Sequence, residues 1–159
     1  MASHGTPATA LLAKQKITHA LHAYEVSPDA PNYGALVATA IGADPARVFK
    51  TLVTEVDGSL TVAVVPVTGE LDLKALASAA GGKRAAMADR AVAERTTGYV
   101  RGGISPLGQR KRLPTVIDAT ALAGDTIFVS AGKRGLQVSL HPDDLVRLTQ
   151  ATVAAIASS

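Results

Sequence analysis

The chain has 159 residues and a mass of 16.2 kDa, with no Cys, no Trp, two Phe and three Tyr. The absence of cysteine excludes disulfide scaffolds, Cys-ligated zinc, iron–sulfur clusters and a thiol nucleophile supplied by the protein. No apolar run reaches the ~18–20 residues of a membrane span, and Met1–Lys16 lacks the order of a secretory signal. We therefore expect a cytoplasmic protein with no membrane association, folded as a single domain over residues 1–159.

The positive charge of the chain is concentrated in residues 81–135. The net charge is +3, but residues 81–135 alone carry ten basic and four acidic side chains. Such bunching suits a polyanionic partner, although a solvated basic face is an equally simple explanation. With five aromatic residues in total, platforms for stacking single-stranded bases are not expected, so contacts with nucleic acid would be mostly to phosphate.

Capping residues and turn signals predict the elements of the first half of the chain. Thr6 and Pro7 favour a helix start, and Asp57-Gly58 between two Val-rich runs is typical of a β-hairpin. The predicted elements are a helix over Thr6–Gln15, a strand over His19–Val26, a helix over Ala35–Ile41 ended by Gly42, and hairpin strands over Val48–Val56 and Leu60–Val67.

The second half alternates between helix and strand patterns. The predicted elements are a helix from Asp72 to Ala80, strands over Ala85–Met87, Thr115–Asp118, Thr126–Ser130 and Leu136–Leu140, a helix over Ala88–Arg95, and closing helices over Pro142–Ile156. Helices and strands interleave without a regular βαβ period, and one hairpin is clear. We therefore expect an α/β, or α+β-like, fold with a mixed sheet.

The usual catalytic motifs are incomplete. Gly103 and Gly108 have the spacing of a phosphate-binding loop, but Gln109-Arg110 stands where that motif needs Lys-Ser or Lys-Thr. Ser105 lacks the last glycine of a nucleophile elbow, and His19 and His22 would point to opposite faces of a strand. We expect no metal site and no cofactor.

Lys50 is the first unusual residue. Side chains alternate along a strand, so Lys50 shares a face with Val48, Leu52 and Val56, which would otherwise pack inward. Burying an unpaired ammonium group costs several kcal/mol on an order-of-magnitude scale. The pattern indicates an anion-binding lysine, or else a lysine whose stem packs on a half-exposed strand while its amine reaches water.

Two glycine-rich loops are the second unusual feature. One spans residues 97–108 and contains four glycines and Pro106, and the other spans residues 130–135. Without a Cβ, backbone N–H groups in such loops can approach a phosphate, a ribose hydroxyl or a developing oxyanion. Glycine turns alone are weak signals, and each loop could simply punctuate the chain.

At these residues the sequence resembles the YbaK family of freestanding aminoacyl-tRNA deacylases, relatives of the editing domain of bacterial prolyl-tRNA synthetases. The resemblance covers nearly the whole chain. Its specific blocks are Phe49-Lys50-Thr51-Leu52 and Gly102-Gly103-Ile104-Ser105-Pro106-Leu107-Gly108, and the match also runs through Lys111-Arg112-Leu113-Pro114 and Gly132-Lys133-Arg134-Gly135.

The resemblance implies a compact domain with a mixed, curved sheet or partial barrel surrounded by helices, acting on mischarged tRNA for proline. It assigns catalytic positions to Lys50, Gly102 and Gly103, with Lys50 anchoring the terminal phosphate or ribose and the glycine amides facing the scissile carbonyl. Substrate-binding positions would be Tyr24, Tyr33, Ser105, Pro106, Ser130 and Gly132. RNA-binding positions would be Arg101, Arg110, Lys111, Arg112, Lys133 and Arg134.

The family's best-known branch cleaves the ester that joins cysteine to tRNA(Pro), and the thiol of the substrate would replace the missing protein nucleophile. Gln137 stands where some members have Asp, and Tyr33 where many have Phe, which leaves the amino acid open. Alternatives are removal of another amino acid such as alanine, a non-catalytic module that binds the 3′ end of tRNA or a nucleotide, and an unrelated phosphate-binding protein. The family also suggests prolyl-tRNA synthetase as a partner.

Overall fold

The computed structural model describes residues 5–158; residues 1–4 and 159 of the expected domain lie outside it. In chain order the elements are α1 (Pro7–Lys14), β1 (His19–Ala23), α2 (Tyr33–Ile41), a 3-10 turn η1 (Pro45–Arg47), β2 (Phe49–Val56), β3 (Ser59–Pro66), β4 (Glu70–Leu71), α3 (Leu73–Ala79), β5 (Ala85–Met87), α4 (Arg90–Thr97), β6 (Thr115–Asp118), η2 (Ala119–Ala123), β7 (Ile127–Lys133), β8 (Leu136–Leu140), α5 (Pro142–Thr149), β9 (Thr152–Ala154) and β10 (Ala157–Ser158). None of the described helices is long and apolar enough to cross a membrane.

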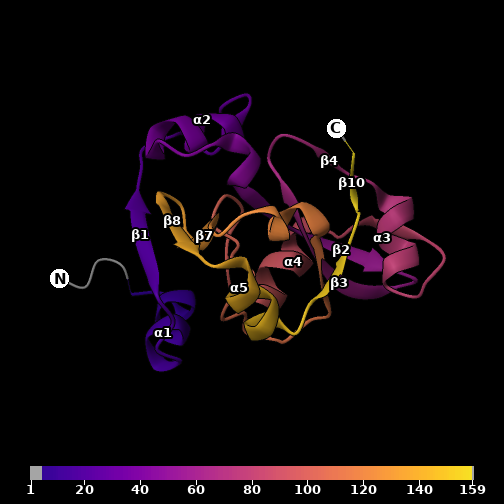
Figure 1. Ribbon diagram of the computed structural model, residues 1–159. Coiled ribbons are helices and arrows are strands. Elements are labelled where there is room, and N and C mark those ends of the chain that lie inside the picture. The colour runs from indigo at the N-terminus through magenta and orange to yellow at the C-terminus, as the bar shows by residue number, and fades with distance from the viewer. Residues whose placement is uncertain (1–4, 159) are drawn as a thin grey trace.

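The strands form a five-stranded sheet, a three-stranded sheet and a two-stranded ribbon (Figure 1). The five-stranded sheet has the order β5-β2-β3-β6-β9; β2 runs antiparallel to β3, whereas β6 runs parallel to both of its neighbours. The predicted α/β fold with a mixed sheet is therefore confirmed. The strands do not form one continuous sheet, because β1, β8 and β7 pair separately and meet the larger sheet through an isolated parallel bridge between Val48 and Phe128. No barrel closes among the described strands.

Two hydrophobic clusters hold these layers together. The larger one fills the space between the three-stranded sheet, α1, α5 and one face of the hairpin, and it includes Phe49, Val62 and Val64. The smaller one packs Val56, Ala63 and Val65 from the other face against α3. Alternate residues of β2 and β3 therefore serve different cores, which fixes the register of the hairpin.

The predicted hairpin is confirmed, with its turn at Asp57-Gly58. Both turn residues have positive φ, 51° and 85°, as a tight turn that matches the twist of the strands requires. The Asp57 carboxylate also accepts hydrogen bonds from the N–H groups of Lys83 and Arg84 at 2.9–3.2 Å, which places β5 beside β2.

The helix starts follow their capping residues. The Thr6 hydroxyl accepts the N–H of Thr9, and the Asp72 carboxylate accepts that of Ala75, as predicted. Helix α4 begins two residues later than the sequence suggested, because the Asp89 carboxylate accepts the N–H of Val92 and makes Arg90 the first helical residue. Helix α2 begins at Tyr33, not at Ala35, and strand β1 ends at Ala23, not at Val26.

The prediction of closing helices over Pro142–Ile156 is wrong beyond Thr149. Gln150 adopts the left-handed conformation that ends α5, and the chain then forms β9, which pairs in parallel with β6, and β10, which pairs with β4. Both N–H groups of Ile156 and Ala157 donate to Oδ1 of Asp118 at 2.9 Å. This tertiary anchor, which local sequence does not reveal, holds the last residues as strands.

Candidate functional site

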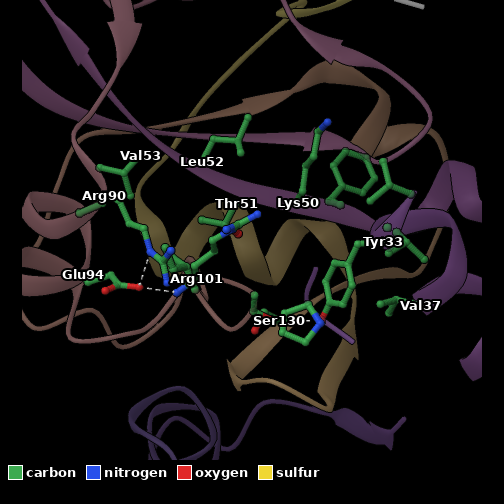
Figure 2. Close-up of a pocket in the computed structure, with 18 of the residues that line it drawn as sticks. Tyr33, Val37, Lys50, Thr51, Leu52, Val53, Arg90, Glu94, Arg101 and Ser130 are labelled. Atoms are coloured by element: carbon green, nitrogen blue, oxygen red, sulfur yellow. Dashed lines mark hydrogen bonds and ion pairs between the residues drawn. The ribbon is translucent and has the colours of Figure 1, made fainter. Parts of the chain in front are cut away.

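A cavity of about 540 Å³ lies along the part of β2 that β5 leaves unpaired (Figure 2). Strand β5 pairs only with Thr54–Val56, so the first half of β2 borders the cavity together with the start of α2, the start of α4 and the loop at residues 101–104. Most of the lining is apolar, with a few polar groups. Such a composition is typical of small-molecule sites.

Lys50 lines this cavity, but it is not unpartnered. Its Nζ lies 3.9 Å from Oε2 of Glu70, whose side chain is 84% exposed, while the Lys50 side chain is 33% exposed. The expectation of a solitary ammonium group is therefore corrected. A pair at this distance and exposure contributes about 1 kcal/mol or less, so the amine stays available to an anion.

The loop at residues 101–103 is fixed by its neighbours on both sides. The Arg101 carbonyl accepts a hydrogen bond from the Nε–H of Arg134, and the Arg101 N–H donates one to Oε2 of Glu94, both at 2.8 Å. The hydrogen bond from the Arg101 N–H is the main reason that the pKa of Glu94 lies below its usual value. A Cβ added to Gly103 would lie 2.7 Å from backbone atoms of Lys133 and Arg134, so the two glycine-rich loops touch backbone to backbone.

The two glycine amides that the sequence singled out differ in availability. The Gly103 N–H already donates to the Val100 carbonyl at 2.8 Å. The Gly102 N–H makes no hydrogen bond among the described residues, and Gly102 lines the cavity with a φ of 86°. Gly102 is thus the amide that can meet a ligand.

Two tyrosines hold the carbonyl group of Gly102 in place. The hydroxyl groups of Tyr24 and Tyr33 lie 2.7 Å apart, and the Tyr33 hydroxyl donates to the Gly102 carbonyl at 3.3 Å. Burial, with the Tyr24 hydrogen bond second, raises the pKa of Tyr33, so the phenol stays protonated and can donate. Tyr33 lines the cavity, whereas Tyr24 acts from behind it.

Ser130 also lines the cavity, together with residues that sequence reasoning missed. Thr51, Arg90 and Glu94 lie in the lining as well, and the Arg90 guanidinium is 3.4 Å from the Glu94 carboxylate. Arg90 and Glu94 are four residues apart on α4, a spacing typical of any exposed helix pair, so their pattern carried no functional signal.

Three of the predicted substrate-binding residues lie away from this cavity. Ser105 is fully buried, and its hydroxyl accepts the Leu107 N–H at 3.1 Å. Pro106 borders a second, smaller groove, and a Cβ on Gly132 would lie 2.8 Å from the ring of Tyr99. Burial raises the pKa of Tyr99 to about 12, and its hydroxyl donates to the Leu107 carbonyl at 2.6 Å. These residues shape the loop from inside.

The predicted RNA-binding residues form two groups. Arg101 lines the cavity, while Lys133, the last residue of β7, and Arg134, in the turn that follows, pack against Gly103 of the same loop. The second group is the exposed segment 110–112, in which the Arg110 side chain reaches the Arg95 carbonyl and Arg112 borders the smaller groove.

Comparison with known proteins identifies relatives of this chain. Residues 28–148 match the family model described as the aminoacyl-tRNA editing domain. A protein of Enterococcus faecalis named "Putative Cys-tRNA(Pro)/Cys-tRNA(Cys) deacylase EbsC" is 46% identical over 123 residues, which cover 76% of this chain and 74% of that protein.

Solved structures show the same fold. One described as a "hypothetical protein APE2540" has a TM-score of 0.84 at 21% identity and covers 96% of this chain and 100% of its own. Another, described as a "putative trans-editing enzyme for prolyl tRNA synthetase", has a TM-score of 0.81 at 21% identity, covering 98% and 99%. The family match and the 46% identical relative together confirm the resemblance seen in the motifs, and the chain belongs to the aminoacyl-tRNA editing domain family.

Proposed function

We propose that this protein is a trans-editing hydrolase that removes cysteine from mischarged tRNA(Pro). The observation that carries the proposal is one cavity whose lining includes Lys50, Tyr33 and Gly102, and the Gly102 N–H makes no hydrogen bond among the described residues. A cationic side chain and an unengaged amide in the lining of one largely apolar cavity suit an aminoacyl ester at the 3′ end of an RNA. The relative from Enterococcus faecalis, whose name specifies Cys-tRNA(Pro), supports the choice of amino acid.

Each group has a distinct proposed role. Lys50 neutralises the phosphate of the terminal adenosine. The Gly102 N–H donates a hydrogen bond to the carbonyl oxygen of the ester as negative charge develops on that oxygen. Tyr33, together with Arg134 and Glu94, keeps the Gly102 backbone in place through the hydrogen bonds to residues 101 and 102. Positioning and electrostatics can then supply the rate enhancement.

The chain has no thiol, so the nucleophile comes from the substrate. The cysteinyl sulfur attacks the ester carbonyl carbon, a C–S bond forms, and the C–O bond to the ribose breaks. The thiol proton passes through water to the ribose oxygen that leaves. The product is a four-membered thiolactone, which water opens to free cysteine. Size alone separates substrates that differ by one methylene by only ~1–3 kcal/mol. The need for a thiol in the substrate also spares prolyl-tRNA, because proline has none.

A panel of substrates tests the proposal. Cysteinyl-tRNA(Pro) is expected to be deacylated, with S-methylcysteinyl-, alanyl- and prolyl-tRNA(Pro) left largely intact. Faster release of alanine than of cysteine would make alanyl-tRNA(Pro) the substrate instead. Turnover of the S-methyl ester would refute attack by the substrate thiol. Binding without turnover of any ester would make the protein a module that recognises the 3′ end of tRNA.

The choice of tRNA is proposed to come from a partner, prolyl-tRNA synthetase. The chain has five aromatic residues, and the hydroxyl groups of all three tyrosines make hydrogen bonds within the fold, which leaves little to read bases. We expect the isolated protein to deacylate cysteinyl-tRNA(Pro) and cysteinyl-tRNA(Cys) at similar rates, and added synthetase to favour the former. Strong intrinsic selection by the isolated protein would contradict a role for a partner.

A further inference from the structure

Strand β1 is an edge strand whose outer side pairs with no other strand of residues 5–158. It begins the three-stranded sheet β1-β8-β7, and Figure 1 shows it at the outer margin of the molecule. Ala20, Leu21 and Ala23 are exposed, and Leu21 is among the large apolar side chains that the fold leaves in contact with solvent. An edge strand presents a row of unpaired N–H and C=O groups to which another strand can add.

The other long strands of the described chain do not offer such an edge. Strand β7, at the far side of the same sheet, is mostly buried; Phe128 forms a bridge to Val48, and the Ala131 carbonyl accepts the Thr6 hydroxyl from the start of α1. The unpaired half of β2 lies inside the cavity. Strand β1 also has none of the usual protection of an edge, since it contains no Lys, no Pro and no bulge.

The pairing with β8 determines which backbone groups of β1 point outward. The Tyr24 N–H donates to the Gly135 carbonyl at 2.9 Å, and β1 pairs with β8 in the same register along its whole length. Hydrogen-bonded and non-hydrogen-bonded pairs alternate in an antiparallel ladder, so every second residue counted back from Tyr24 bonds to β8. The N–H and C=O groups of the residues between them point away from β8. These residues are His19, Leu21 and Ala23.

The two ends of β1 carry opposite charges. Lys14 and Lys16 precede the strand and Glu25 follows it, and all three side chains are exposed. The strand itself has no Asp, Glu, Lys or Arg. If two such strands pair in antiparallel orientation, the basic end of each lies beside the acidic end of the other, whereas parallel pairing would bring like charges together. The charges therefore favour antiparallel pairing of this strand with a copy of itself.

We propose that β1 pairs with β1 of a second copy of this chain, in antiparallel orientation and across a two-fold axis at Leu21. In this register Leu21 faces the partner's Leu21 and His19 faces the partner's Ala23, so the outward N–H and C=O groups of all three residues find acceptors and donors. A two-fold interface must be self-complementary, and this strand meets that condition. The two three-stranded sheets become one sheet of six strands. No residue of β1 lines the cavity, so both cavities stay open.

The mass of the protein in solution tests the proposal. Light scattering and sedimentation are measured from about 5 to 200 µM, because an interface this small associates weakly. The wild-type mass should rise with concentration from 16.2 kDa toward twice that value. Leu21→Lys and Leu21→Glu each place like charges directly opposite one another, so each variant alone should stay monomeric, and an equal mixture of the two should recover the dimer. Leu122→Lys, at an exposed position of η2, is the control and should behave as the wild type.

Proline substitutions separate pairing between copies from folding of one copy. The Leu21 N–H points away from β8, so Leu21→Pro removes no hydrogen bond from the monomer. This variant should lose the dimer but keep the melting temperature that the wild type has at low concentration. Ala20→Pro removes a hydrogen bond to β8 and should lower the melting temperature instead.

Several results would overturn the proposal. A wild type that stays at 16.2 kDa throughout would show that this edge does not pair with itself. Dimers that persist in Leu21→Pro or in both charge variants would place the interface elsewhere. Failure of Leu21→Lys and Leu21→Glu to combine would contradict a two-fold axis at Leu21. If the charge variants do not fold, Leu21→Pro still decides whether β1 carries the interface.

Discussion

Replacing Lys50 by Met tests the cation of the cavity most directly. A unit charge ~4 Å from a phosphate oxygen gains about 1 kcal/mol in water and about 4 kcal/mol at the effective dielectric constant of a protein surface. Since the Lys50 side chain is 33% exposed, we expect a value between these limits, about 2–3 kcal/mol. Lys50→Met should therefore lower kcat/KM for cysteinyl-tRNA(Pro) by about 30- to 150-fold.

The assay compares initial rates of cysteine release for Lys50→Met and for Glu70→Gln as the matched control. Glu70 is 84% exposed and competes for the same amine, so its loss should leave the rate unchanged or raise it slightly. Lys50→Arg should keep part of the activity because the charge remains. The reasoning is refuted if Lys50→Met keeps most of its activity, or if Glu70→Gln loses as much as Lys50→Met, since the pair would then be structural.

Three further changes have calculable outcomes. Gly103→Ala forces a Cβ to within 2.7 Å of the backbone at Lys133 and Arg134, and its urea midpoint should fall by an amount equivalent to about 2 kcal/mol or more. Burial alone would raise the pKa of Asp118, but hydrogen bonds from Thr120 and from the 156–157 backbone outweigh it and hold the pKa below its usual value. The free energy of unfolding of the wild type should therefore hold above about pH 4 and fall as the pH drops further. Asp118→Asn should be about 2–4 kcal/mol less stable at pH 7 and should lack that part of the acid dependence. Identical acid profiles of the two proteins would contradict this. Replacing the basic residues 110–112 by Gln should reduce the dependence of log K on log salt by up to about 2–3 in tRNA binding, and an unchanged slope would mean a solvated face.

Local sequence rules predicted those elements whose ends are set by their own side chains. The Asp57-Gly58 turn and the caps at Thr6 and Asp72 act over three or four residues, so their patterns were sufficient. The C-terminal strands are different. Their pairing depends on β6, β4 and the Asp118 carboxylate, each about 35 residues or more away along the chain, and helix propensity alone favoured the wrong structure there.

The sequence predicted those residues of the candidate site that are unusual for their position in the chain. Lys50 on an apolar face and Gly102 in a glycine-rich loop lie in one cavity with Tyr33 and Ser130. Ser105, Pro106 and Gly132 share the same motifs but face inward or toward another groove, because adjacent residues of a loop point in different directions. Thr51 looked like an ordinary strand residue, and only the fold reveals that its hydroxyl has no partner within residues 5–158.

The incomplete pairing of β2 has a wider consequence. Exposed strand edges invite other chains to add a strand, a common route to aggregation. Here the edge at residues 50–52 is recessed behind α2, α4 and the 101–104 loop, so an extended polypeptide cannot reach it easily while a compact ligand can. Strand β5 thus stops where the open edge of β2 begins to border the cavity. Lengthening β5 by design through residues 88–90 would close the cavity, because Ala88 and Arg90 lie in its lining and the extended strand would pair with the open edge of β2.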